Sequence, residues 1–106
     1  YVWAEHGMNL EESEEMIKAA LKQEPENAAF LDSLGWVYYK QGKYKKAEEY
    51  LLAAAEKMKD AIIYEHLGDV YRAMGEKEKA LEYYRQGLAL ESDNEKLKER
   101  IQQYGE

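Results

Sequence analysis

The chain has 106 residues, enough for one domain with an elongated hydrophobic core but not for two independent ones. Its 15 basic and 22 acidic residues give a net charge of −7, which argues against nucleic-acid or anionic-membrane partners because both need a basic patch. The chain has no cysteine, which excludes disulfides and thiol nucleophiles. No apolar stretch approaches the roughly 20 residues of a membrane span, so we expect no direct membrane insertion.

A 33-residue internal repeat organises the chain. The segment LGWVY at 34–38 returns as LGDVY at 67–71, and Gly42 returns as Gly75 at the same offset. Such a period is typical of stacked supersecondary units, none of which can bury its apolar face alone. Because helix-forming residues dominate and only one proline is present, we predict an all-α fold.

The first unit along the chain is incomplete. Residues 1–7 align with residues 36–42, so the chain is expected to begin inside a helix whose opening turns are absent. Asn9, with a glutamate three positions later, follows the capping-box pattern and predicts a helix over 10–23. Residues 24–27 form the expected turn out of that helix.

Two complete helix hairpins follow. Each consists of a helix, a glycine able to take the left-handed conformation of a helix C-terminus, and a second helix. The predicted segments are 28–41, Gly42 and 44–57 in the first hairpin, and 61–74, Gly75 and 77–90 in the second. Apolar and small residues at steps of three and four predict a buried stripe on each second helix. These stripes are Tyr44, Ala47, Leu51, Ala54 and Met58, and Ala80, Tyr83, Tyr84, Gly87 and Leu88.

A terminal helix over 95–106 is expected to shield the last hairpin. Residues 92–95 repeat the capping-box pattern, with a serine followed three positions later by a glutamate. Leu97, Ile101 and Tyr104 give this helix one apolar face. The side chains predicted to stay in solvent are Lys96, Lys98, Glu99, Arg100 and Gln103.

These residues resemble the tetratricopeptide repeat (TPR), with its pattern W-x2-L-G-x2-Y, then A-x3-F, then P, over 34 positions. The signature places are filled by Leu31, Leu34, Gly35, Tyr38, Ala47, Leu51 and Ala54, and by Tyr64, Leu67, Gly68, Tyr71, Ala80, Tyr84 and Gly87. Residues 3–27 resemble the later part of another repeat, with Trp3, Ile17, Ala20 and Pro25 at its places.

The resemblance implies a right-handed α-solenoid of tandem helix-turn-helix repeats with a C-terminal capping helix. It implies one TPR domain over 1–106, divided into a partial repeat (1–27), two repeats (28–60 and 61–94) and the capping helix (95–106). The sequence of the repeats is similar to that of repeats in bacterial multi-repeat proteins. This resemblance implies a bacterial source and is compatible with location in either the cytoplasm or the periplasm.

Glycines inside the first helices indicate close helix packing. Glycine costs about 1 kcal/mol relative to alanine at a mid-helix position, so Gly35 and Gly68 need a compensation. We expect the backbones to approach closely there, with Ala47 and Ala80 supplying the facing small surfaces.

In peptide-binding relatives the first helices line a concave groove, read by their second, fifth, ninth and twelfth positions. The resemblance therefore points to a peptide-binding groove formed by Asp32, Trp36, Tyr39, Glu65, Asp69 and Arg72, with Tyr1 and Ala4 extending the row. Aromatic faces and carboxylates both favour cations, so the expected ligand has an apolar body and positive charge. The alternative is that the aromatic residues only pack between first helices and the carboxylates form a solvated face.

A chaperone-tail ligand is not expected. Some family members grip a C-terminal carboxylate with lysine, asparagine and arginine residues from three successive first helices. The corresponding places here hold Asp32, Trp36, His66, Lys96 and Arg100, of which only the last two match. A carboxylate at the first place would repel the ligand.

The sequence indicates no catalytic site, metal site or cofactor. His66 and Asp69 are spaced to share a helix face, but two ligands do not make a site. The ten tyrosines fall mostly at core places of the repeat, which argues against base stacking with nucleic acid.

The sequence therefore predicts a non-enzymatic scaffold that binds a protein or peptide ligand. The alternative is a self-associating or spacing segment of a longer repeat protein. Apolar surface around Leu10, Met16 and Ile17 would then be covered by upstream repeats, or by homodimerisation through the truncated N-terminal repeat.

Overall fold

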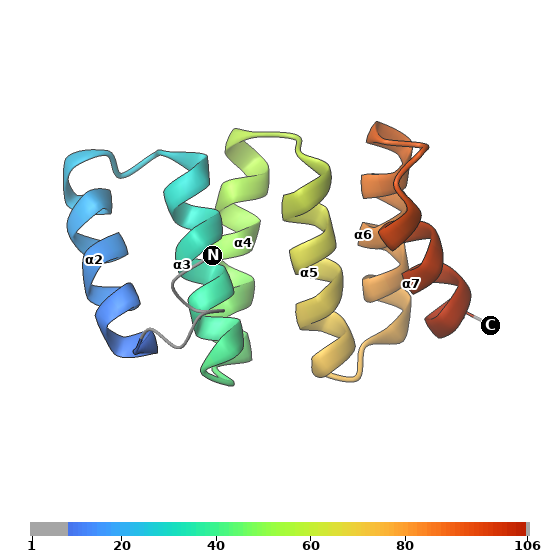
Figure 1. The fold of residues 1–106 in the computed structure, drawn as a ribbon, viewed down its shortest axis with the longest axis horizontal. Coiled ribbons are helices and arrows are strands. Elements are labelled where there is room, and N and C mark those ends of the chain that lie inside the picture. Colours follow the sequence, from blue (N-terminus) through green and yellow to red (C-terminus); the bar gives the residue numbers. More distant parts are fainter. Residues whose placement is uncertain (1–8, 106) are drawn as a thin grey trace. The chain divides into compact units, whose positions relative to one another are not determined.

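A computed structural model describes the backbone of residues 9–105 and the side chains of residues 9–104. This part of the chain forms six α-helices and no strand (Figure 1). The helices are α2 (Leu10–Gln23), α3 (Ala28–Lys40), α4 (Tyr44–Lys57), α5 (Ala61–Ala73), α6 (Lys77–Leu90) and α7 (Glu95–Gly105). The all-α prediction is confirmed, whereas the incomplete helix expected over residues 1–7 lies outside the described residues. None of the described helices is both long and apolar enough to cross a membrane.

The chain divides into two compact units that part between Met58 and Lys59. In unit 1, α3 packs against α2 and α4, and in unit 2, α6 packs against α5 and α7. The paired helices α3 and α4, and likewise α5 and α6, run in opposite directions (Figure 1). Each unit therefore contains one complete helix hairpin and one further helix packed against it.

Capping residues set where α3, α5 and α7 begin. The side-chain oxygens of Asn27, Asp60 and Asn94 accept hydrogen bonds from the first-turn amides of Phe30, Ile62 and Leu97, at 3.1, 2.7 and 3.0 Å. An N-terminal cap of this kind satisfies an amide that has no partner within the helix. The prediction that residues 92–95 form a capping box was wrong, because the cap of α7 is Asn94 and the helix begins after it.

The predicted helix-ending glycines are confirmed. Gly42 and Gly75 both have φ of 81°, a conformation that costs a residue with a side chain about 1–2 kcal/mol. The chain reverses at each of them, from α3 into α4 and from α5 into α6. Asn9 caps α2 as predicted, accepting from the amide of Glu11 at 2.7 Å.

The mid-helix glycines make room for large side chains on the facing helix. A Cβ atom on Gly35 would lie 2.6 Å from Cγ of Leu51, and one on Gly68 would lie 2.3 Å from the ring of Tyr84. The same Cβ on Gly35 would lie 3.2 Å from the backbone oxygen of Ala47, so close approach is confirmed in unit 1. In unit 2 the three atoms nearest to a Cβ on Gly68 all belong to the Tyr84 ring, and Ala80 on the same helix α6 is fully buried.

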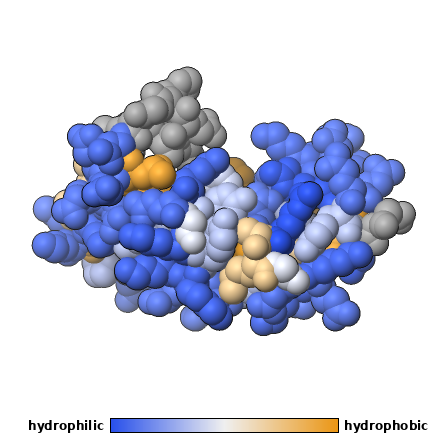
Figure 2. All heavy atoms as spheres, turned by 90° about the horizontal axis from the view of Figure 1, so that it is seen from below, coloured by the Kyte–Doolittle hydropathy of each residue, from blue (hydrophilic) through white to orange (hydrophobic). Residues whose placement is uncertain are grey.

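The buried stripes are shorter than predicted. On α4 only Ala47, Leu51 and Ala54 are buried, while Met58 is 46% exposed at the end of the unit. On α6, Leu81 is buried, whereas Tyr83 and Leu88 are half-buried. The face of the molecule seen in Figure 2 is mostly hydrophilic, with small apolar patches, as the 35% of charged residues would produce.

Candidate binding surface

The six predicted groove residues lie on two helices in different units. Asp32, Trp36 and Tyr39 project from α3 in unit 1, and Glu65, Asp69 and Arg72 project from α5 in unit 2. Within each helix they recur every three or four residues, so each set of three follows one face.

In unit 1 an aromatic cluster forms along α3. The rings of Trp36 and Tyr39 stack with centroids 4.8 Å apart, and Tyr44 at the start of α4 lies 5.8 Å from Tyr39. Nζ of Lys40 lies 5.1 Å from the centroid of the Trp36 ring, a cation–π geometry. Both Trp36 and Tyr39 are half-buried, so part of each ring remains in contact with solvent.

The carboxylates of the predicted groove are not a solvated face. Asp32 is 3% exposed and Asp69 is 7% exposed. A buried carboxylate must have hydrogen-bonding or charged partners, because the desolvation of a bare charge is strongly unfavourable. The solvated-face alternative was therefore wrong for these two residues.

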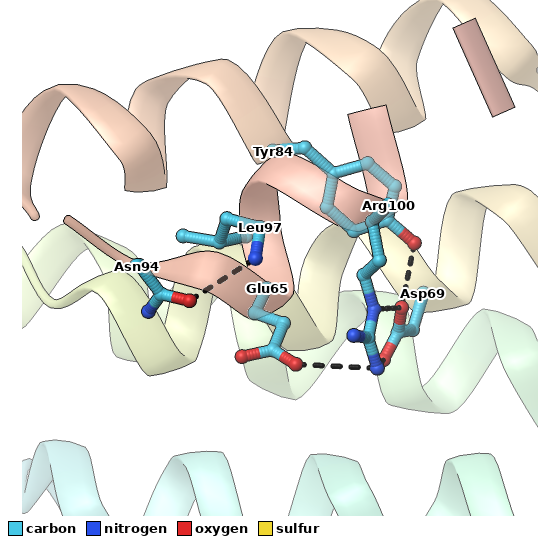
Figure 3. A network of polar contacts seen from close by, with 6 residues as sticks. All are labelled: Glu65, Asp69, Tyr84, Asn94, Leu97 and Arg100. Carbon is cyan, nitrogen blue, oxygen red and sulfur yellow. Dashed lines mark hydrogen bonds and ion pairs between the residues drawn. The ribbon is translucent and has the colours of Figure 1, made fainter. Parts of the chain in front are cut away.

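In unit 2 the partner of Asp69 is Arg100 from α7 (Figure 3). The guanidinium donates through Nε to Oδ1 of Asp69 at 2.9 Å and through Nη2 to Oδ2 at 3.4 Å. Nη2 also lies 3.2 Å from Oε2 of Glu65. Tyr84 on α6 donates its hydroxyl proton to Oδ1 of Asp69 at 2.6 Å. One aspartate thus joins α5, α6 and α7.

The electrostatics of this cluster follow from its burial. Burial raises the pKa of Tyr84, and the hydrogen bond to Asp69 and its negative charge raise that pKa further. Partial burial acts to lower the pKa of Arg100, but the hydrogen bond to Asp69 and the charges of Asp69 and Glu65 outweigh it and raise that pKa. Tyr84 therefore stays a proton donor and Arg100 stays charged across the physiological pH range.

Arg72 is also engaged by α7. Its guanidinium carbon lies 4.9 Å from the ring centroid of Tyr104, and Nζ of Lys77 lies 6.0 Å from the same ring. Both distances are within the range of cation–π attraction. All three predicted binding residues of α5 therefore contact the capping helix.

Sequence reasoning missed the role of Arg100, which was expected to stay in solvent. Its side chain is 30% exposed and paired with two carboxylates. The signal that could have found it is its place three residues after Leu97 and four before Tyr104, which puts all three on one helix face. The same cluster accounts for Asp69, which was weighed together with His66 for metal or base chemistry.

A second polar cluster, in unit 1, was also missed. Glu14 on α2 forms an ion pair with Lys18 at 2.7 Å and accepts hydrogen bonds from Gln41 at 3.0 Å and the Tyr38 hydroxyl at 3.2 Å. The bonds from Lys18 and Gln41 lower the pKa of Glu14 to about 2. This cluster ties α2 to the C-terminal end of α3, where Tyr38 directly precedes Tyr39 of the predicted groove in sequence.

Comparisons with known proteins agree with the fold. Models of the tetratricopeptide repeat match residues 9–61 and 61–94. A TPR repeat-containing protein of Pseudomonas aeruginosa is 40% identical over 60 residues, which is 57% of this chain and 10% of that protein. This relative is a bacterial protein, which supports the prediction of a bacterial origin.

Two solved structures have the same fold. A thermophilic TPR protein of Thermus thermophilus has a TM-score of 0.85 and 27% identity, covering 90% of this chain and 49% of that one. The first TPR of Spaghetti, solved with an HSP90 peptide, has a TM-score of 0.90 over 97% of this chain and 82% of that one, and its 18% identity shows the fold alone. This chain spans about a tenth of the Pseudomonas relative and about half of the Thermus chain. With the family models matched over 9–61 and 61–94, the chain belongs to the tetratricopeptide repeat family.

Proposed function

We propose that this chain is a protein-interaction module that binds a peptide or helix of a partner along the face of its first helices, read by Asp32, Trp36, Tyr39, Glu65, Asp69 and Arg72. The observation that carries the proposal is the stacked pair Trp36 and Tyr39, half-buried on α3. Large aromatic side chains that remain partly exposed are characteristic of binding hot spots. The solved complex of a TPR with an HSP90 peptide shows that the fold can hold a peptide.

The expected ligand combines an apolar surface with positive charge. The net charge of −7 and the aromatic rings both favour a cationic segment. Arg100 and Lys96 are the two residues that match a carboxylate clamp, and Arg100 is already paired with Asp69 and Glu65. A free C-terminal carboxylate would have to compete with those two carboxylates, so the proposed ligand is not a chaperone tail.

Selection from a displayed library of random 12-residue peptides tests the proposal. We expect the peptides captured by the wild-type chain to carry lysine or arginine near an apolar residue. Their affinity should fall at least about tenfold with Trp36→Ala, as for a central hot spot, and should weaken as salt rises. Lys45→Ala is the matched control, since that side chain is 83% exposed on α4. Equal binding to the Trp36→Ala variant, or binding insensitive to salt, would contradict the proposal.

The alternative function is self-association or spacing within a longer repeat protein, with homodimerisation through the N-terminal residues as one form. Of the apolar residues expected to form an association surface, Met16 on α2 is 47% exposed and supports it. Ile17 is 6% exposed and belongs to the core, so its expected place on that surface was wrong. Light scattering over a concentration series separates the two functions. A chain that selects no peptide but dimerises with rising concentration would favour the alternative.

A further inference from the structure

The apolar contact between the capping helix α7 and the rest of unit 2 centres on one fully buried side chain. Leu97 is fully buried, at 0% exposure. Its Cδ1 would lie 3.0 Å from a Cβ atom placed on Gly87 of α6, so the side chain packs closely against the backbone there. Ile101 and Tyr104 are only half-buried. A helix of 11 residues is marginal by itself, so its local stability depends on its contacts with the rest of unit 2.

The helix α7 also contacts α5 through ion pairs and a cation–π contact, and these involve the α5 residues predicted to bind a partner. Arg100 forms ion pairs with Glu65 and Asp69, and the ring of Tyr104 contacts the guanidinium of Arg72. In Figure 3 the guanidinium of Arg100 points between the two carboxylates, next to the hydroxyl of Tyr84. The chain thus places its own cation and its own aromatic ring on its own binding residues.

We propose that α7 is an internal ligand of this α5 surface, and that a partner helix carrying leucine, arginine and an aromatic residue at the spacing of Leu97, Arg100 and Tyr104 displaces it. The proposal rests on the proposed function and adds a partner chemistry and a regulatory step to it. Unit 2 is closed to partners while α7 is docked, and it opens when α7 detaches.

The geometry selects arginine over lysine at the central position. Arg100 uses Nε and Nη2 together to contact both oxygens of Asp69, and Nη2 also reaches Glu65. A planar guanidinium can make these contacts at once, whereas an ammonium acts as a single point charge. The hydroxyl of Tyr84 donates a further hydrogen bond to Oδ1 of Asp69 and so helps to fix the orientation of that carboxylate.

A labelled synthetic peptide of residues 94–106 is the probe, added to the whole chain of residues 1–106. In the wild type the docked α7 competes at a high effective concentration, so the peptide should bind weakly. Arg100→Gln in the chain weakens that competitor, and we expect peptide affinity measured by fluorescence anisotropy to rise about tenfold or more. A peptide with lysine at the Arg100 position should gain much less.

Two control variants guard the result against effects on folding. Lys98→Gln removes a positive charge from the exposed side of α7 and should leave peptide affinity at the wild-type level. Adding Asp69→Asn to Arg100→Gln should abolish the gain, because the receptor carboxylate is lost. Should Arg100→Gln reduce helicity by circular dichroism, Tyr104→Ala, which removes the ring that Arg72 contacts, serves as the second variant that loosens α7.

Failure of this inference is distinct from failure of the proposed function. Equal affinity of the peptide for the wild type, Arg100→Gln and Tyr104→Ala would overturn it, as would equal binding of the arginine and lysine peptides. A wild-type dimer that the peptide dissociates would assign the surface to α7 of a second copy and overturn the partner form. Binding of library peptides that depends on Trp36 tests only the proposed function, because the 94–106 peptide is matched to the α5 surface and not to Trp36 on α3.

Discussion

Single residues of unit 2 combine a packing role with a polar one. The ring of Tyr84 fills the space that Gly68 leaves open on α5, and its hydroxyl donates to Asp69, the next residue of that helix. A smaller residue at position 84 would remove both contacts, and a larger one at position 68 would displace the ring. The glycine and the tyrosine are therefore one coupled pair.

Substitution of the glycines separates steric from conformational effects. A Cβ on Gly68 would lie 2.3 Å from the Tyr84 ring, so we expect Gly68→Ala to lower the free energy of unfolding by about 1–3 kcal/mol through overpacking. Gly75→Ala has nothing within 4 Å of its Cβ and should cost about 1–2 kcal/mol from its positive φ alone. Urea unfolding measures both. In a Tyr84→Leu background the cost of Gly68→Ala should shrink while that of Gly75→Ala is unchanged, and equal costs in both backgrounds would contradict the pairing.

Glu14 gives a pH-dependent prediction. Its pKa falls from 4.5 to about 2 in the folded chain because of its bonds with Lys18 and Gln41. A lowered folded pKa means that the ionised carboxylate stabilises the fold above pH 4.5, and that this contribution is lost as the pH falls towards 2. We expect Glu14→Gln to lower the free energy of unfolding at pH 7 by about 1 kcal/mol, and the difference from wild type to shrink below pH 4.5.

The control for this measurement is Glu15→Gln, which removes an exposed carboxylate one residue further along α2. Its effect should be small at neutral pH. A difference between Glu14→Gln and wild type that stays constant from pH 7 to pH 2 would show that Glu14 does not carry this pH dependence.

At the scale of elements, the two helices of each hairpin begin in different ways. The helices α3, α5 and α7 start at a side-chain cap, whereas α4 and α6 follow a left-handed glycine and show no side-chain cap bond at Lys43 or Glu76. The connections before α3 and α5 contain no left-handed glycine, and there a capping side chain satisfies a first-turn amide. The second starts directly from the tight glycine turn.

This difference predicts unequal costs for alanine substitution. Asn27→Ala removes the acceptor for the Phe30 amide and should cost about 1 kcal/mol. Lys43→Ala, at the start of α4, should cost little, because its side chain makes no capping bond there. Thermal unfolding followed by circular dichroism compares the two, and a larger loss for Lys43→Ala would contradict the assignment of the caps.

For the whole molecule, the two compact units predict unfolding in stages. Repeat proteins are stabilised by intrinsic unit stabilities and nearest-neighbour terms, so a weakened unit can unfold before its neighbour. Trp36 lies in unit 1, so in a Trp3→Phe background its fluorescence reports on that unit, whereas far-ultraviolet circular dichroism reports on all helices.

Leu97→Ala is the variant that tests this behaviour. Loss of this fully buried side chain of α7 should weaken unit 2 by about 2–5 kcal/mol. We expect the dichroism midpoint in urea to fall below the fluorescence midpoint in this variant. Gln102→Ala, at an exposed position of the same helix, should leave the two midpoints as in the wild type. Coincident midpoints in Leu97→Ala would show that the chain unfolds as one cooperative unit.

The sequence by itself determined the helices, their order and their turns. The features that predicted them are local or periodic: the 33-residue repeat, the periodic apolar residues and the two glycines with positive φ. Such features can be recognised in a sequence without knowledge of the fold. It also determined which face of α3 and α5 carries aromatic and acidic side chains, because helical spacing alone places them.

Only the tertiary structure decided which partners those side chains have. Asp69 and Glu65 pair with Arg100 from a helix that begins 26 residues after Asp69 and was expected to present that arginine to solvent. The Tyr84 ring fills the space at Gly68. Pairings of this kind depend on how one helix rotates and slides against another, and helical spacing within each sequence segment does not specify that rotation.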